Sequence, residues 1–156
     1  MEPLSIRKAQ ESDILVLFEW ANEPVTRANS ISQSLIQWEN HQVWFSRKLQ
    51  DPNCFLYISE QNAVAVGMLR LEYGNEKATI SYSIAKNHRG KGLGKKTLEV
   101  GIKQFLGDCQ KPISMIEALV KPENIASVKT FEKLGFHRSE DRVIQGVRLW
   151  MFEFRV

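Results

Sequence analysis

The sequence predicts an α+β protein in which a central, mostly antiparallel sheet carries helices on both faces. Three observations support this class. Apolar residues alternate with polar ones in several short runs, which is the period of a strand. In other segments they recur every three or four residues, which is the period of a helix. Short turns separate the strand-like runs in the middle of the chain, so these runs are expected to pair as antiparallel neighbours.

Local residues mark where most of these elements begin and end. Ser12 or Asp13 can cap the first helix, Pro24 helps to stop it, and Gly135 can close the last one. The expected order is therefore a strand at residues 4–9, helices at 14–21 and 36–49, strands at 54–59, 63–73 and 77–85, a helix at 93–107, a strand at 113–120, a helix at 124–135 and a hairpin that turns at Gln145 and Gly146.

Composition predicts a single domain over residues 1–156 that binds a small anionic molecule. The chain has 43% hydrophobic and 25% charged residues and a net charge of +3, which favours such a ligand over nucleic acid. Cys54 and Cys109 stand alone, so neither a metal site nor a redox pair is expected. The N-terminus lacks an apolar signal core, and no run approaches the ~20 apolar residues of a membrane span. We therefore expect a cytoplasmic protein with no membrane partner.

The stretch NHRGKGLGKKTLEVG at residues 87–101 places three glycines between a strand and a helix. Its spacing matches neither a P-loop nor a dinucleotide fingerprint. It does match the pattern Arg-x-x-Gly-x-Gly through Arg89, Gly92 and Gly94. Such a loop can turn its backbone N–H groups inward and bind a pyrophosphate at the start of the helix. The alternative is a glycine-rich turn whose lysines are merely solvated.

A second motif lies in VKPENIASVKTFEKLGF at residues 120–136, where Asn124 and Ser127 follow a strand and Gly135-Phe136 follows a helix. Together the two motifs resemble those of the GNAT superfamily of acetyl-CoA-dependent N-acetyltransferases. The resemblance implies a GNAT-type fold, whose sheet splays between the strand that ends at Ile84 and the strand that ends at Val120. Acetyl-CoA would enter this opening as co-substrate, and no metal is implied.

The resemblance also implies which residues hold the cofactor. The pantetheine arm would pair with the backbone of Ser83, Ile84 and Ala85, and Asn124 and Ser127 would lie beside it. Asn124 can also cap its helix, and Ser127 can be a small packing residue. Phe131 stands where many relatives carry the tyrosine that protonates the departing thiolate. The pyrophosphate would rest on the loop residues Arg89, Gly90, Lys91, Gly92, Leu93, Gly94 and Lys95.

Acyl transfer requires a neutral amine and stabilisation of an oxyanion. A backbone N–H near Ile84 is the expected oxyanion donor. The amine must lose a proton, and a near-neutral imidazole such as that of His41 suits this step. The candidate bases are His41, Glu117, Glu72 and His88. Of these, His41 and Glu117 are the two that we assign to catalysis.

The N-terminal third indicates the acceptor. The arrangement Trp-x-Asn-x-Pro-x-x-Arg-x-x-Ser at residues 20–30, followed by His-x-x-Trp-Phe at 41–45, resembles a GNAT branch that acetylates nucleotide-linked deoxyamino sugars, as in pseudaminic acid biosynthesis for surface glycans. The nucleobase of such a substrate needs an aromatic surface to pack on, and its phosphates need a cation such as Arg27 or Arg70. The expected substrate-binding residues are Arg27, Ser30, His41 and Trp44.

Two other functions fit the same motifs. One is a protein or peptide N-acetyltransferase, although the basic and aromatic N-terminal third favours an anionic acceptor. The other is a non-catalytic acyl-CoA-binding module, which the phenylalanine at position 131 would suit. The aromatic C-terminal strand at residues 147–156 could pair across a homodimer or within the sheet.

Overall fold

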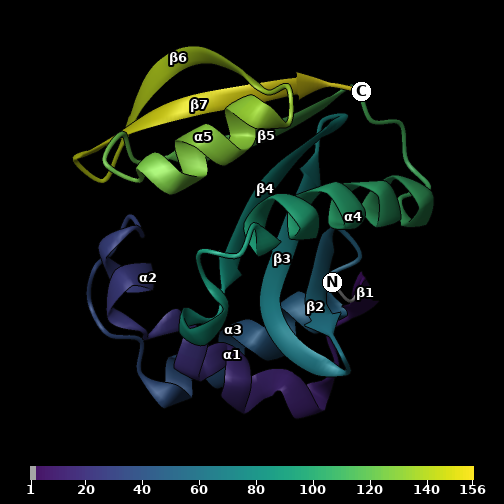
Figure 1. Cartoon of the computed structure of the whole chain (residues 1–156), viewed down its shortest axis with the longest axis vertical. Helices are drawn as coiled ribbons and strands as arrows, with labels where there is room; N and C mark the ends of the chain where they lie inside the picture. The colour runs from purple at the N-terminus through teal and green to yellow at the C-terminus, as the bar shows by residue number, and fades with distance from the viewer. Residues whose placement is uncertain (1–2) are drawn as a thin grey trace.

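A computed structural model describes residues 3–156. One seven-stranded sheet runs through the molecule in the order β1-β2-β3-β4-β5-β7-β6 (Figure 1). The strands are β1 Leu4–Lys8, β2 Cys54–Gln61, β3 Val64–Gly74, β4 Lys77–Ile84, β5 Met115–Val120, β6 His137–Ile144 and β7 Val147–Arg155. The helices are α1 Ile14–Ala21, α2 Pro24–Ala28, α3 Trp38–Gln50, α4 Leu93–Asp108 and α5 Ile125–Lys133.

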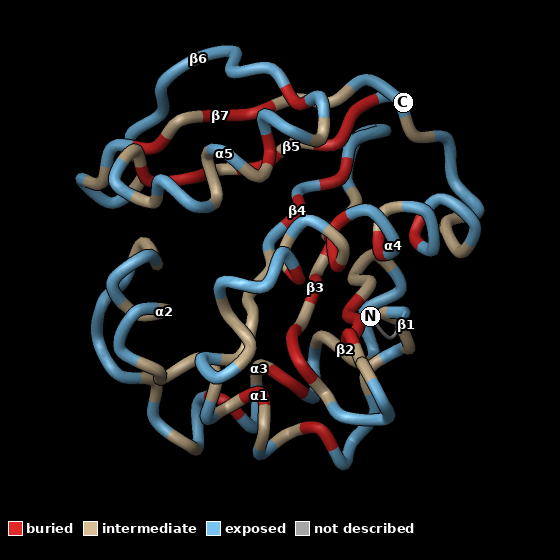
Figure 2. Tube along the Cα trace, in the orientation of Figure 1, coloured by how far each residue is buried: buried red, intermediate tan, exposed pale blue. Residues whose placement is uncertain are grey.

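The predicted α+β class and the antiparallel meander are confirmed. Strands β1 to β4 pair consecutively and antiparallel, because short turns join β2 to β3 and β3 to β4. The β6–β7 hairpin turns at Gln145 and Gly146, both of which have positive φ. Strand β7 lies between β5 and β6, so the C-terminal strand pairs within the sheet and offers no free edge to a second copy. The outer strand β6 is exposed along most of its length (Figure 2).

Two apolar clusters hold the helices on opposite faces of the sheet. On one face, Leu98 and Phe105 of α4 and Phe131 of α5 pack against a cluster that includes Leu69 and Ile80. On the other face, α1 and α3 pack through the smaller cluster of Leu17, Phe45, Leu56 and Ile58. Alternation along each strand supplies both faces, because successive side chains point in opposite directions. No helix within residues 3–156 has the length and apolar character needed to cross a membrane.

The short helix α2 is the element that sequence patterns did not predict. The run Asn22-Glu23-Pro24 does end α1, as expected, but Pro24 also occupies the first turn of α2. Proline suits that position because its fixed φ matches a helix and its missing N–H would have no partner there. The Glu23 side chain caps α2 by accepting a hydrogen bond from the backbone N–H of Val25 at 2.8 Å.

The sheet opens between β4 and β5, which form the one parallel pair among the strands of residues 3–156. Pairing joins only Lys77–Thr79 of β4 to Met115–Glu117 of β5. Beyond these residues, β4 continues to pair with β3 as far as Ile84, and β5 continues to pair with β7 as far as Val120. The two strands therefore diverge as the arms of a V, as the family resemblance implied, and each arm is supported from its outer side.

Candidate active site

A cleft of about 740 Å³ occupies the opening between β4 and β5. Strand β4 and the start of α4 form one wall, and the end of β5 together with α5 forms the other. Helix α2 and the segment that follows it close one end, so three separate parts of the chain surround the space (Figure 1). The expected cofactor-binding residues that line it are Ser83, Ile84, Arg89, Gly90, Gly92, Leu93, Gly94, Lys95, Asn124, Ser127 and Phe131.

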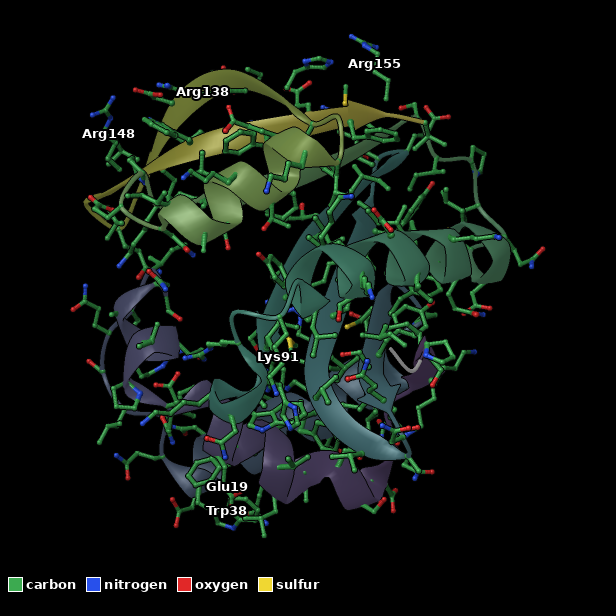
Figure 3. All side chains as sticks on the ribbon, in the orientation of Figure 1. Glu19, Trp38, Lys91, Arg138, Arg148 and Arg155 are labelled. Atoms are coloured by element: carbon green, nitrogen blue, oxygen red, sulfur yellow. The ribbon has the colours of Figure 1, made fainter. Side chains whose placement is uncertain are left out.

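The glycine loop has the backbone shape that an anion site requires. Gly90 and Gly92 have φ of 77° and 76°, in the left-handed region that favours glycine. Gly92 is the N-cap of α4, so the first amides of that helix lack intrahelical partners and face the loop. Lys95 lines the cleft and pairs with Glu99 at 3.1 Å, whereas Lys91 is exposed and is not part of the lining (Figure 3). The loop thus concentrates partial positive charge at one end of the cleft.

The backbone of β4 shows which residues can pair with an extended ligand. The Ala85 N–H donates to the Val66 carbonyl at 2.8 Å and therefore points toward β3. Because alternate residues of a strand direct their backbone groups to opposite sides, Tyr82 and Ile84 present theirs to the opening. The Ile84 N–H therefore faces the opening, as an oxyanion donor would have to, and its neighbour on the open edge is Tyr82 and not Ala85.

Arg89 joins the glycine loop to α2 rather than leaving its guanidinium free for phosphate. Its Nε donates to the Ile84 carbonyl at 3.0 Å, and its Nη2 donates to Thr26 Oγ1 at 3.3 Å. The same Nη2 pairs with a carboxylate oxygen of Glu23. A cation that holds three separate partners positions the loop and α2 relative to each other.

Strand β4 places a tyrosine in the cleft, beside α5, that sequence analysis did not single out. The Tyr82 hydroxyl lies 2.9 Å from Ser127 Oγ, and its ring meets that of Phe131 edge to face at a centroid distance of 5.7 Å. Burial raises the pKa of the Tyr82 phenol, and hydrogen bonds with Ser127 and Thr130 offset part of the rise. Alternation with the buried Ala78 and Ile80 could have indicated that Tyr82 points to the α4 and α5 face.

Asn124 has the capping role that was foreseen as its alternative. It is the N-cap of α5, and its Oδ1 accepts a hydrogen bond from the Ser127 N–H at 3.3 Å. Its side chain also lines the cleft, so capping and a role in binding are compatible.

His41 does not lie where sequence analysis expected it. The side chain is buried on the α3 face, and its Nε2 lies 2.8 Å from the Ile14 carbonyl. Its ring packs among aromatic rings that include those of Trp44 and Phe45. It does not line the cleft, and this corrects the assignment of His41 to both proton removal and acceptor binding.

Trp44 also lies outside the cleft, in a separate shallow depression on α3. It nonetheless contacts the site indirectly, because its ring supports the guanidinium of Arg70 at 5.3 Å from the centroid. Arg70 lines the cleft, and no ion pair or hydrogen bond within residues 3–156 engages its guanidinium. A nucleotide base would therefore not reach Trp44 from the cleft, whereas an anion would reach Arg70.

Arg27 and Ser30 line the cleft, as expected, but the guanidinium of Arg27 already makes four hydrogen bonds within the protein. It donates to the Ala21 carbonyl at 2.7 Å, to Ser30 Oγ at 3.0 Å, and to the carbonyls of Ser32 and Ser34. Lys121, which sequence analysis missed, is buried and donates to the Ala28 carbonyl at 2.8 Å across the mouth of the V. Both cations hold the α2 region in place.

Comparison with known proteins places this geometry in a family. The model of the acetyltransferase (GNAT) domain matches residues 4–137. The chain belongs to the GNAT family of N-acetyltransferases. The earlier resemblance is thus confirmed at the level of the family, and so is the enzyme class.

Relatives of this GNAT enzyme differ in what they acetylate. An uncharacterised N-acetyltransferase, p20, from Bacillus licheniformis is 28% identical over 148 residues, which cover 88% of this chain and 80% of p20. The L-amino acid N-acyltransferase MnaT of Escherichia coli strain K12 is 28% identical over 140 residues, with coverage of 85% and 79%. The structure of AAC(6')-Ib with ribostamycin and coenzyme A superposes with a TM-score of 0.85 at 18% identity over 99% of this chain and 94% of the other, which shows the shared fold.

The remaining candidate bases of this GNAT enzyme can now be placed. Glu117 pairs with Lys77 at 3.1 Å near the closed end of the V and does not line the cleft, which corrects its assignment to catalysis. Glu72 is paired with Lys48 and also lies outside. Within residues 3–156, no carboxylate lines the cleft, and His88 is the one histidine that does.

Proposed function

We propose that this chain transfers the acetyl group of acetyl-CoA to the primary amine of a small molecule that also carries an anionic group. The acceptor class that we favour is a nucleotide-linked deoxyamino sugar. The observation that carries the proposal is the free guanidinium of Arg70 at the acceptor end of a cleft whose other end has a glycine-rich anion site. One end suits the donor's pyrophosphate, and the other suits a second anion.

The donor side is supported by the shape of the backbone. Coenzyme A carries a pyrophosphate and an extended pantetheine arm with amide groups. Gly92 and the first turn of α4 offer N–H groups to the former, and the open edge of β4 at Tyr82 and Ile84 offers a strand partner to the latter. AAC(6')-Ib, which shares the fold, is seen with coenzyme A bound.

The chemical step follows from these positions. The neutral amine attacks the thioester carbonyl, the C–N bond forms, and the Ile84 N–H stabilises the resulting oxyanion. The C–S bond then breaks, and the thiolate of coenzyme A leaves. No carboxylate from the described residues 3–156 lines the cleft, which leaves water and the His88 imidazole to accept the amine proton.

The acceptor side favours an anion beside hydroxyl groups. Arg70 pairs across the sheet with Ser81, and Ser83 lies on the same face of β4. All three line the cleft. A guanidinium can bind phosphate through two parallel hydrogen bonds, and serine hydroxyls can bind those of a sugar ring.

An amino acid is the second candidate acceptor. Its α-carboxylate would match Arg70 equally well by chemistry, and MnaT, a relative with 28% identity, is an L-amino acid N-acyltransferase. The two candidates differ in size, in the presence of a sugar ring and in the separation between anion and amine.

A thiol-release assay with acetyl-CoA and a matched amine panel tests the proposal. The panel contains a nucleotide-linked amino sugar, the same amino sugar without its nucleotide, L-amino acids and an uncharged amine. We expect the highest kcat/KM with the nucleotide-linked sugar and a loss of about tenfold or more without the phosphates. A preference for amino acids would make an amino acid the acceptor in place of the nucleotide-linked sugar. Equal rates with the uncharged amine would refute a role for an anionic group in acceptor binding.

A further inference from the structure

A phenol is present in the cleft although position 131 lacks one. Tyr82 reaches across the V from β4, and its hydroxyl lies 2.9 Å from Ser127 Oγ on α5. Phe131 follows Ser127 by one helical turn, and its ring meets the Tyr82 ring at 5.7 Å. Helical side chains lean toward the N-terminus, so the far end of the Phe131 ring lies over the turn that carries Ser127. The Tyr82 hydroxyl therefore occupies the neighbourhood that a hydroxyl on residue 131 would enter.

We propose that the Tyr82 hydroxyl donates a hydrogen bond to the sulfur of coenzyme A as the thiolate leaves, with Ser127 holding the phenol in position. This rests on the proposed function, because it needs a thioester in the cleft. Either hydroxyl of the Tyr82–Ser127 pair can donate. In the proposed arrangement Ser127 donates to the phenolic oxygen, and the phenolic hydrogen points at the sulfur.

The electrons and protons of the step balance without a further reactant. The C–S pair moves to sulfur when the C–N bond has formed, and the O–H group of Tyr82 stabilises the new negative charge. The phenol keeps its proton, since burial holds its pKa above the ordinary value. The released thiolate takes a proton from solvent, and the amine has already given one to solvent or to His88.

Packing explains why this tyrosine can hold one orientation. A Cβ on Gly94 would lie 3.2 Å from Tyr82 Cε2, so the start of α4 sits directly against one edge of the ring. Phe131 covers another edge, and Ser127 fixes the hydroxyl. A group held on three sides loses little freedom when a ligand binds, which favours a short, directed hydrogen bond.

Titration of the thiol of bound coenzyme A tests this inference without any acceptor. The thiolate is followed by its ultraviolet absorbance in wild type, Tyr82→Phe, and Tyr82→Phe combined with Phe131→Tyr. Hydrogen bonding to the charged form lowers a pKa. We therefore expect the thiol pKa to rise by about one unit in Tyr82→Phe and to return toward wild type in the double variant. The other titratable groups that line the cleft are the same in all three proteins, so their effects on the thiol pKa cancel; they are Arg27, Arg70, His88, Arg89, Lys95, Lys121 and Lys133.

Calorimetry on the same proteins separates this role from a structural one. Tyr82→Phe should bind coenzyme A with affinity within about threefold of wild type and, with a working acceptor, should lose about tenfold in kcat. The control is Tyr73→Phe, which removes a phenol that donates to the Pro112 carbonyl outside the cleft and should change neither the thiol pKa nor the affinity.

Three outcomes would decide against the inference. An unchanged thiol pKa in Tyr82→Phe, with coenzyme A still bound, overturns the role of Tyr82 and leaves the cofactor site intact. Loss of binding in step with the change in pKa shows a packing role instead. Failure of wild type itself to bind coenzyme A overturns the proposed function, and the inference with it.

Discussion

Arg27 and Arg70 are two arginines that line the same cleft but differ in what their guanidinium groups bind. The Arg27 guanidinium donates hydrogen bonds to three backbone carbonyls and to Ser30, and these bonds fix the segment after α2. Arg70 rests on the ring of Trp44 and keeps its donors for the cleft. Stacking on an aromatic ring orients a guanidinium without occupying its N–H groups. We therefore expect the first arginine to contribute to stability and the second to binding.

A matched pair of lysine substitutions tests this difference. Arg27→Lys loses the fork that reaches several carbonyls, so we expect the free energy of unfolding to fall by about 1 to 3 kcal/mol. Arg70→Lys loses bidentate binding and the stacking of the guanidinium on Trp44 but no internal hydrogen bond, so stability should stay within about 0.5 kcal/mol while KM for an anionic acceptor rises about tenfold. Thermal unfolding and steady-state kinetics measure the two effects. The reverse pattern, with Arg70 governing stability, would contradict these roles.

Single residues also show where sequence patterns stop being informative. His41 and Trp44 lie on the helix that was predicted, yet helical spacing does not say which other element covers that face. In the structure α1 packs there, and the Ile14 carbonyl takes the hydrogen bond that was expected for a substrate. Tyr82 was overlooked for the converse reason. Its partner Ser127 is 45 residues away along the chain, so no local pattern joins them.

The start of α4 is the element on which we expect binding of acetyl-CoA to depend. Its N-cap, Gly92, has φ of 76°, a value that costs other residues about 1 to 2 kcal/mol. Local patterns predicted this feature well, because the need for glycine is set by the backbone of the loop itself. The same is true of Gly135, which closes α5 with φ of 90°.

Substitution of Gly92 should therefore affect both folding and binding. We expect Gly92→Ala to lower the free energy of unfolding by about 1 to 2 kcal/mol and to weaken acetyl-CoA binding at least tenfold, because the loop must change shape. Denaturant unfolding and calorimetry are the measurements. Gly107→Ala is the control: Gly107 lies in α4, a new Cβ would meet no atom within 4 Å, and stability should rise by about 0.5 to 1 kcal/mol. Unchanged binding in Gly92→Ala would argue against the loop as the pyrophosphate site.

At the scale of elements, the junction of β1 with α1 makes a contribution to the stability of the fold that depends on pH. Arg7 holds the buried carboxylate of Asp13 through two hydrogen bonds of 2.8 Å, and the Gln10 N–H adds a third. These contacts lower the pKa of Asp13, and the hydrogen bonds from Arg7 have the greatest effect on it. The folded state thus binds this proton more weakly than the unfolded chain does.

Stability from this carboxylate should be present above the unfolded pKa of about 3.9 and should be lost as the pH falls through the lower folded value. Each pKa unit by which folding lowers the pKa of Asp13 adds about 1.4 kcal/mol to the free energy of unfolding. We expect Asp13→Asn to be less stable than wild type at neutral pH and to approach it in acid. Unfolding midpoints measured across this acid range give the comparison. A constant difference at all pH values would mean that packing, and not charge, sets the effect.

At the scale of the whole molecule, the sheet consists of two parts whose strands β4 and β5 pair through three residues each, beneath an apolar cluster that both parts share. β1 to β4 with α4 form one part, and β5 to β7 with α5 form the other. The opening between them was predictable only through the family resemblance, because nothing in the strand patterns shows where a parallel pair will diverge. Arg89 and Lys121 reach from the two sides to the α2 region, so α2 bridges the mouth of the V.

A ligand that pairs with β4 should slow hydrogen exchange at the backbone N–H groups that face the opening and not at those that face β3. Ile84 presents its N–H to the opening, whereas the Ala85 N–H is already bonded to the Val66 carbonyl. With saturating acetyl-CoA, we expect hydrogen exchange to slow at Tyr82 and Ile84 by at least tenfold more than at Ala85, as followed by NMR. Ala85 serves as the internal control, since general stabilisation by a bound ligand slows every amide that exchanges by global unfolding. Equal slowing at Ile84 and Ala85 would mean that acetyl-CoA binds without adding a strand to the open edge, and the assignment of Ile84 as oxyanion donor would then lose its geometric basis.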